Sequence, residues 1–113
     1  MDTQDTINKI EQSLRIGQLN DNPHLCAEYV ASMSGELSFF LSQQGEIAKD
    51  RAENWLEIRK NCKSDTQAEK EWSLTEKGIG YAWYEVRIRR IKALLVGLKT
   101  LIRMAESEQR NLQ

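Results

Sequence analysis

The stretch that decides the fold is YEVRIRRIKALLVGLKTLIRMA, residues 84–105. Its apolar side chains recur every three or four residues, which is the spacing of one face of an α-helix. The series runs Tyr84, Ile88, Ile91, Leu95, Leu98, Ile102 and Ala105, and Leu94 and Leu101 widen it on one side. An apolar face this wide is more than contact with a single neighbouring helix covers. The stretch therefore predicts a long helix in a bundle of three or more helices.

A second long series comes earlier in the chain, with the same alternating steps of four and three residues. It runs Cys26, Val30, Met33, Leu37, Phe40, Gln44 and Ile47. Asp21 or Asn22 can cap a helix here, and Pro23 suits its first position because proline has no amide to lose. We predict a helix over residues 23–60 that packs side by side with the first one. Glycine weakens a helix, so a bend at Gln44–Gly45 stays open as an alternative.

The first residues of the chain predict a short amphipathic helix over residues 3–19. Its apolar positions, Ile7, Ile10 and Leu14, follow helical spacing, and Gly17 with the polar residues after it marks a stop. A helix of about 15 residues spans only about 22 Å. It is too short to cover the whole of a long hairpin.

A turn and a third helix complete the predicted fold. Residues 61–66 interrupt the second series, and Ser64 or Asp65 can cap a new helix there. We predict this helix over residues 65–109. A break at Gly78–Gly80 is the alternative, because two close glycines can end one helix and start another.

Together these elements predict an all-α fold: a long antiparallel helical hairpin of coiled-coil type with a short N-terminal helix. The sequence shows no linker, repeat or low-complexity tract, so residues 1–113 are expected to form a single domain. Near Trp72, Ile79 and Trp83 the third helix is apolar on a second face. That face needs the N-terminal helix or another subunit to cover it. The fold is therefore expected to be a three-helix bundle or a bundle of two copies, with a dimer as the predicted oligomer.

The composition argues against membrane insertion and secretion. The longest apolar run, residues 93–98, is far shorter than the roughly 20 residues that span a bilayer. The N-terminus is acidic and polar, unlike a secretory signal, so we expect a cytoplasmic protein without membrane contact. Cys26 and Cys62 are predicted to lie too far apart for a disulfide within one chain, and their apolar neighbours favour buried thiols.

Motifs for catalysis and metal binding are missing from the sequence. His24 is the single histidine and no close cysteine pair occurs, so nothing favours a zinc site. No nucleophile elbow, phosphate loop or metalloprotease motif is present, and Glu69, Glu71 and Glu76 resemble acids on a helix surface. We therefore expect no enzymatic activity, no cofactor and no metal.

Charge is distributed unevenly along the chain. Residues 1–82 carry nine Lys or Arg against fourteen Asp or Glu, whereas residues 83–113 carry seven against three. Between Glu85 and Glu106 all charged residues are basic, and we call them the basic ridge: Arg87, Arg89, Arg90, Lys92, Lys99 and Arg103. Such a ridge can follow phosphates, dock on an acidic protein, or simply be the solvated back of a helix.

Three short motifs near the C-terminus resemble a group of phage proteins. They are EWSLTEKG at residues 71–78, KALL at 92–95 and LIRMAE at 101–106. In small uncharacterised helical proteins that phage and prophage genomes encode near recombination and replication genes, a W-x-x-T-x-x-G segment leads into a similar long helix. The resemblance covers about the last 45 residues, and the tail QRNLQ lacks the aromatic ending of that group. It implies a phage setting and no particular activity.

From these observations we predict a non-enzymatic helical module for protein–protein interaction. The resemblance adds the expectation of a phage accessory protein that acts on host or phage nucleic-acid machinery. The expected partner-binding surfaces are the basic ridge and the apolar residues Trp72, Ile79 and Trp83. Two alternatives stay open: direct nucleic-acid binding through the basic ridge, and a structural role in coiled-coil assembly.

Overall fold

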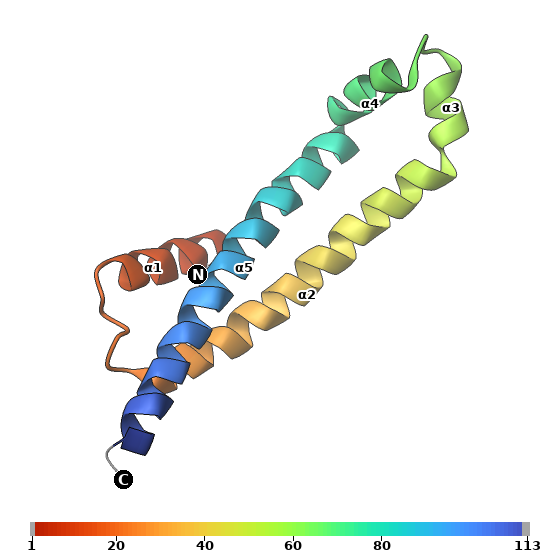
Figure 1. The fold of residues 1–113 in the computed structure, drawn as a ribbon. Helices are drawn as coiled ribbons and strands as arrows, with labels where there is room; N and C mark the ends of the chain where they lie inside the picture. Colours follow the sequence, from red (N-terminus) through yellow and green to blue (C-terminus); the bar gives the residue numbers. More distant parts are fainter. Residues whose placement is uncertain (1, 112–113) are drawn as a thin grey trace. The chain divides into compact units, whose positions relative to one another are not determined.

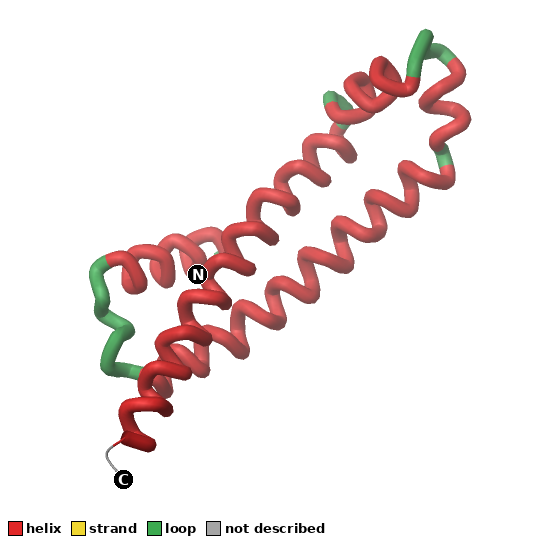
Figure 2. Tube along the Cα trace, in the orientation of Figure 1, coloured by secondary structure: helices red, strands yellow, loops and turns green. Residues whose placement is uncertain are grey.

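The computed structural model describes residues 2–111 and contains five α-helices in that range (Figures 1 and 2). They are α1 (Thr3–Arg15), α2 (Pro23–Glu53), α3 (Trp55–Lys60), α4 (Asp65–Ser73) and α5 (Glu76–Asn111). Turns and loops join them, and the described residues include no strand. The predicted all-α fold is confirmed. Residue 1 and the last two residues of the predicted domain lie outside the described range.

The two long helices, α2 and α5, pack against each other in opposite directions. The Gln44 side chain donates from Nε2 to the Tyr81 carbonyl at 3.4 Å and to Glu85 Oε2 at 2.7 Å. Six residues further along α2, Asp50 Oδ2 lies 2.6 Å from Lys77 Nζ. The partners on α5 come earlier in the sequence as α2 advances, which is the pattern of antiparallel helices. The predicted helical hairpin is therefore confirmed.

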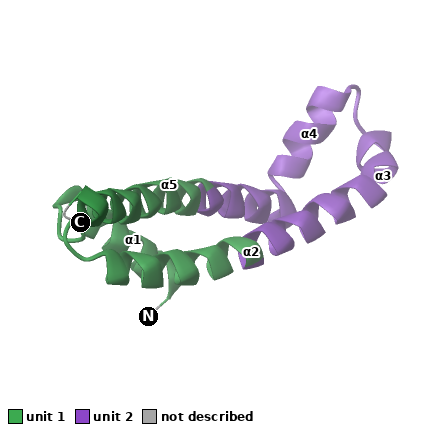
Figure 3. Ribbon diagram, turned by 60° about the horizontal axis from the view of Figure 1, so that its bottom comes forward, with its two compact units in different colours: residues 1–38, 89–113 green, residues 39–88 purple. Residues whose placement is uncertain are grey.

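The chain divides into two compact units (Figure 3). Unit 1 comprises residues 1–38 and 89–113, and it contains α1, the first part of α2 and the later part of α5. Unit 2 comprises residues 39–88, with the rest of α2, α3, α4 and the start of α5. α2 and α5 each have residues in both units. That residues 1–113 form a single domain stays a prediction.

Unit 1 is built from three helices around an aliphatic core. Ile7 and Ile10 of α1 are fully buried, and so are Ile91 and Leu98 of α5. The other buried apolar residues of this unit are Leu19, Cys26, Met33, Leu94 and Leu95. The wide apolar face of residues 84–105 is thus covered on two sides here, by α2 and by α1. The short N-terminal helix is confirmed as the third helix of this core.

The structure ends α1 at Arg15, earlier than the predicted range of 3–19. The Gln18 N–H donates to the Ser13 carbonyl at 3.0 Å, and the Gly17 N–H donates to the Leu14 carbonyl at 3.3 Å. This pair of hydrogen bonds ends a helix when the first residue after the helical cap has a left-handed backbone conformation. Gly17 has φ of +76°, a conformation that glycine adopts at little cost.

Two predicted helix starts have the expected caps. The Asn22 side-chain oxygen accepts a hydrogen bond at 3.1 Å from the backbone N–H three residues on, at the start of α2. Ser64 Oγ accepts an equivalent bond at 3.1 Å at the start of α4. Of the residues that the sequence left open, Asn22 rather than Asp21 and Ser64 rather than Asp65 make the capping bonds.

The structure differs from the predicted helix over residues 23–60 at one residue. Asn54 lies between α2 and α3, with φ of −106° and ψ of 9°. Its side-chain amide donates to the Asp50 carbonyl at 2.8 Å and so adds to the backbone bond at the same acceptor, as asparagine side chains often do within helices. α2 continues through Gly45, so the helix does not end there. The bend at Gln44–Gly45 stays an alternative.

The predicted helix over residues 65–109 is two helices, separated by residues 74–75. Thr75 caps the second one, because its Oγ1 accepts a hydrogen bond from the Gly78 N–H at 3.2 Å. A Cβ atom on Gly78 would lie 2.2 Å from the Trp72 carbonyl oxygen. Only glycine lets the end of α4 come so close to the start of α5. The break therefore precedes the two glycines at which the sequence left it open.

Unit 2 has few buried apolar side chains and many exposed ones. Its buried apolar residues are Phe40, Cys62, Ala68 and Ile88. Its large apolar residues that remain exposed are Phe39, Leu41, Leu56, Leu74, Ile79, Trp83 and Val86. Among the described residues, unit 1 has only Ile16, Val96 and Met104 in this exposed class. Unit 2 therefore carries most of the exposed large apolar side chains among the described residues.

Candidate functional site

A group of exposed apolar side chains in unit 2 forms the candidate site. Trp83 is 44% exposed, and it lies on α5 between Ile79 and Val86, which are 60% and 52% exposed. Residues at these spacings share one face of a helix. Phe39 of α2 is 55% exposed, and its ring centroid lies 6.1 Å from that of Phe40. We call the four exposed residues, Phe39, Ile79, Trp83 and Val86, the apolar surface.

The buried ring of Phe40 joins the two helices that carry this surface. Its centroid lies 5.7 Å from that of Trp83 and 5.6 Å from that of Tyr84. Trp83 and Tyr84 also meet edge to face, with centroids 5.1 Å apart. Tilted and edge-to-face aromatic pairs contribute about 0.5–1.5 kcal/mol beyond the area they bury. These contacts hold the Trp83 indole in place while much of it stays open to solvent.

The structure separates the three residues that the sequence grouped as an apolar interface. Trp72 belongs to α4, and the break at residues 74–75 ends the helical phase that linked it to α5. Ile79 and Trp83 stay on one face of α5. Val86 was missed although its spacing from both residues could have shown it. Phe39 could not be found this way, because its place depends on how α2 meets α5.

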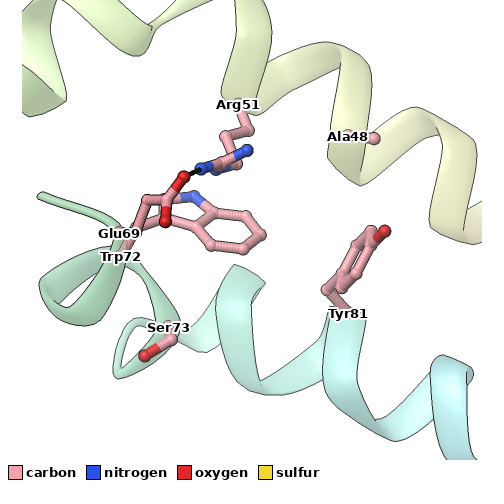
Figure 4. A pocket seen from close by; sticks show the side chains of 6 residues that line it. All are labelled: Ala48, Arg51, Glu69, Trp72, Ser73 and Tyr81. Carbon is pink, nitrogen blue, oxygen red and sulfur yellow. Dashed lines mark hydrogen bonds and ion pairs between the residues drawn. The ribbon is translucent and has the colours of Figure 1, made fainter. Parts of the chain in front are cut away.

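Trp72 instead lines a pocket of about 320 Å³ within unit 2 (Figure 4). The other lining residues are Ala48, Arg51, Glu69, Ser73 and Tyr81. Trp72 meets Tyr81 edge to face, with ring centroids 6.0 Å apart. The Arg51 guanidinium carbon lies 5.1 Å from the Trp72 centroid and 4.8 Å from that of Trp55. Arg51 Nη2 also lies 3.2 Å from Glu69 Oε1, which is the dashed contact in Figure 4.

The aromatic lining of this pocket is of the kind that binds a cation, and the protein's own Arg51 takes that place. Aromatic faces attract a cation, and Arg51 already lies against two indoles. Glu69 pairs with the same guanidinium, so the charged groups that line the pocket are matched to each other. The remaining walls, chiefly Trp72 and Tyr81, can accept a small planar or apolar group. The hydroxyl of the lining residue Ser73 donates to the Lys70 carbonyl at 2.6 Å.

Arg90 and Arg87 of the basic ridge contact other groups of the protein. Arg90 donates from Nη2 to Asn8 Oδ1 at 2.7 Å and from Nε to Glu11 Oε2 at 3.2 Å. The hydrogen bond with Glu11 raises the pKa of Arg90, so the Arg90 guanidinium stays protonated. The Arg87 guanidinium lies over the Trp83 ring, 3.8 Å from the centroid, and Nη1 donates to the Trp83 carbonyl at 3.3 Å. Arg90 thus holds α1, and Arg87 supports Trp83.

The other four cations of the ridge are exposed on α5 within unit 1: Arg89, Lys92, Lys99 and Arg103. Their steps of three, seven and four residues place them on one helix face. Lys92, Lys99 and Arg103 have no hydrogen bond or ion pair with any residue that the structure describes. Lys92, Lys99 and Arg103 are therefore available to an anionic partner.

The remaining titratable groups include no apparent metal site within residues 2–111, where no cluster of three His, Cys, Asp or Glu side chains could hold an ion. His24 is exposed, with Nε2 3.1 Å from Glu28 Oε1. Both cysteines are buried and unbridged. The Cys62 thiol donates to Glu71 Oε2 at 3.2 Å, which raises the pKa of Cys62, and burial raises the pKa of Cys26. In the same range, the structure contains no helix with the length and apolar character that a membrane span requires.

No protein-family model, curated protein or solved structure matches this chain. The resemblance to phage-encoded helical proteins therefore stays an expectation drawn from three short motifs. The apolar surface and the exposed Lys92, Lys99 and Arg103 are the features that a partner could contact.

Proposed function

We propose that this protein is a helical protein–protein interaction module without enzymatic activity, and that a partner protein binds its apolar surface. The observation that carries the proposal is the exposed stripe of Ile79, Trp83 and Val86 on α5, with Phe39 of α2 beside the ring that packs on Trp83. Single exposed apolar residues are ordinary on a protein surface, whereas a cluster of them marks an interaction site.

The energetics favour a role for this cluster in binding. Complete burial of a large apolar side chain contributes about 1.5–3 kcal/mol, and each residue of the apolar surface has roughly half of that still to gain. Tryptophan is among the residues that most often dominate the free energy of an interface. Trp83 lies at the middle of the stripe, and Phe40 and Arg87 hold its ring before any partner arrives. An anchor that is already ordered loses little side-chain entropy on binding.

Binding suits the described residues better than catalysis does. General acid and base catalysis needs titratable groups that converge on a pocket. The pocket at Trp72 holds the mutually paired Arg51 and Glu69. The single histidine, His24, is exposed beside Glu28 at the start of α2.

A phage accessory role is the second part of the proposal. Its support is the resemblance of residues 71–78, 92–95 and 101–106 to phage-encoded helical proteins. In that setting the partner of the apolar surface would belong to host or phage nucleic-acid machinery. The genes beside this one test the idea, because recombination or replication genes are expected there and their lack would contradict it.

Direct nucleic-acid binding is a second candidate function, favoured by the exposed Lys92, Lys99 and Arg103. On duplex DNA the slope of log affinity against log salt is about −0.9 for each phosphate neutralised, so three contacts give a slope of about −3. Arg87 and Arg90 are engaged elsewhere, which leaves fewer cations than the sequence suggested. Lack of binding to single- and double-stranded DNA and RNA at about 50 mM salt would reject this candidate.

Two proposals concern copies of this chain. One is the structural alternative, assembly as a coiled coil, and the other is the predicted dimer. A second copy would cover the apolar surface in place of another protein. Light scattering at tens of micromolar separates the two, because a dimer gives twice the molar mass of the 13.1 kDa chain.

Site-specific crosslinking tests the main proposal. A photo-reactive amino acid replaces Val86 in the apolar surface, or Val96, which is 65% exposed elsewhere on α5 and serves as the matched control. We expect a discrete crosslinked partner in the source cells from position 86 and not from position 96, and its loss when Ile79→Asp is added. Equal products from both positions, or products that Ile79→Asp does not affect, would contradict the proposal.

A further inference from the structure

One helical face of α5 carries both residues that α1 contacts and residues of the apolar surface. In sequence order these positions are Ile79, Trp83, Val86, Arg90 and Gly97. Their steps of four, three, four and seven residues keep one face of an α-helix. In unit 1, α1 lies on this face, where Glu11 binds Arg90 and a Cβ on Gly97 would come within 3.4 Å of Leu14. In unit 2 the same face of the helix is exposed.

The α1 helix shows what kind of segment this face accepts. It has 13 residues, and its Ile7 and Ile10 are fully buried. Directly after Ile10 comes Glu11, whose carboxylate binds the guanidinium of Arg90. The protein itself therefore covers this face of α5 with a short amphipathic helix that has one acid beside its apolar stripe.

The apolar surface offers an arginine in a comparable position. Arg87 follows Trp83 by four residues, as Arg90 follows Val86 by four. It has no carboxylate partner among residues 2–111, and its one hydrogen bond there is to the Trp83 carbonyl at 3.3 Å. A cation at the edge of an apolar face selects a partner with an acid next to its own apolar stripe.

The size of the apolar surface suits one helix better than a second copy of the chain. Phe39 and Trp83, about half exposed, offer roughly 100 Å² each, and the smaller Ile79 and Val86 offer no more, which makes roughly 400 Å² at most. A stable dimer commonly buries about 800 Å² on each copy, about twice that amount. Recognition of a helix in a groove needs only a few anchors at positions i, i+3 or i+4 and i+7.

We propose that the apolar surface binds a single amphipathic helix of a partner protein. The helix presents apolar side chains at i, i+3 or i+4 and i+7 to the four residues of the apolar surface, and an acid beside them pairs with Arg87. This inference rests on the proposed function and adds the chemistry of the partner segment.

Selection from a displayed library of random 16-residue peptides tests the inference, with the full-length protein as bait. Enriched peptides are then titrated by fluorescence anisotropy against the wild type, the double variant Ile79→Asp/Val86→Asp, and the control Val96→Asp. All three replaced side chains are exposed, so the variants should keep their fold, which circular dichroism verifies. We expect enriched peptides with the apolar spacing and acid described above, which gain helix on binding. The double variant should lose about tenfold or more in affinity, and the control should stay within about twofold.

The role of Arg87 is tested with the same peptides. Replacing the peptide acid by its amide should weaken binding about three- to tenfold to the wild type, and no further to Arg87→Gln. An equal effect of the amide on both proteins would overturn the pairing.

The remaining outcomes separate this inference from the proposed function. Peptides that depend on Ile79 and Val86 but bind as extended or basic segments would overturn the helix and leave the apolar surface as a protein-binding site. If no peptide is enriched, or the enriched peptides bind the double variant as well as the wild type, both proposals fail.

Discussion

Unit 1 and unit 2 use the same two long helices in different ways. In unit 1 a third helix, α1, is present, and the buried residues are mainly aliphatic, with Ile7, Ile10, Ile91 and Leu98 fully buried. In unit 2 the contacts between α2 and α5 are chiefly aromatic and polar, and the outer face of α5 stays open at Trp83 and its neighbours. The comparison teaches that one helical face is packed where a third helix covers it and stays exposed where none does.

The largest expected effect comes from a charge in the core of unit 1. Leu98→Asp buries an unpaired carboxylate at a fully buried position, and we expect a loss of several kcal/mol in the free energy of unfolding. The adjacent Lys99→Asp changes an exposed side chain and should stay within about 0.5 kcal/mol. Urea unfolding measures both variants. Similar losses in the two would overturn the assignment of this face of α5 to the core.

In unit 2, two glycine substitutions give the sharpest test of how closely α4 approaches α5. Gly78→Ala places a Cβ 2.2 Å from a backbone oxygen of α4, so the connection must shift, and we expect a loss of about 1–3 kcal/mol. Gly45→Ala, also in unit 2, meets no atom within 4 Å inside α2, and it should instead stabilise the protein by up to about 1 kcal/mol. Thermal melts of both variants give the comparison. Stabilisation by both would mean that α4 does not approach α5 as described.

Much of this fold could be predicted because its signals are local. The seam of Ile88, Ile91, Leu95 and Leu98 follows from spacing alone, and the caps at Asn22 and Ser64 follow from residue type. The sequence predicted one helix over residues 65–109 and left a break open at Gly78–Gly80, whereas the helices are separated at residues 74–75. Gly78 resembled a helix stop. It is instead the small residue that fits under the end of α4, and Thr75 is the actual start signal.

The candidate site could be predicted only in part, for a reason that is also physical. Ile79 and Trp83 share a helical face that spacing reveals, whereas Phe39 and the pocket residue Arg51 depend on contacts between distant segments. The basic ridge shows the same limit. The sequence shows six cations in the ridge. That Arg90 binds α1 and that Arg87 lies on Trp83 depends on contacts that only the folded structure shows.

A smaller effect distinguishes the ion pairs of the two units. The Arg90–Glu11 pair of unit 1 is less exposed than the Arg51–Glu69 pair of unit 2, whose carboxylate side chain is 62% exposed. Double-mutant cycles to glutamine should give a coupling of about 1 kcal/mol for the first pair and under about 0.5 kcal/mol for the second. A larger coupling in unit 2 would mean that its pocket contributes more to stability than its packing indicates.

The smallest expected effect concerns the two thiols, one in each unit. The pKa values of Cys26 and Cys62 are both raised, so folding favours the protonated thiols. Their contribution to stability is therefore present at neutral pH and is lost as pH rises past about 9, where thiolates form more readily in the unfolded chain. Alkylation by iodoacetamide at pH 8 should be slower than for a free thiol. Reaction at the rate of free cysteine would show that the thiols are open to solvent.

Native-state hydrogen exchange is the measurement that tests the central claim most directly, because it reports local stability along the whole chain. If the stable core lies in unit 1 and unit 2 keeps apolar surface for a partner, the amides of residues 91–98 should exchange only through global unfolding. The amides of α3 and α4, which have few buried side chains, should exchange faster through local opening. Protection in α3 and α4 equal to that of residues 91–98 would contradict the account.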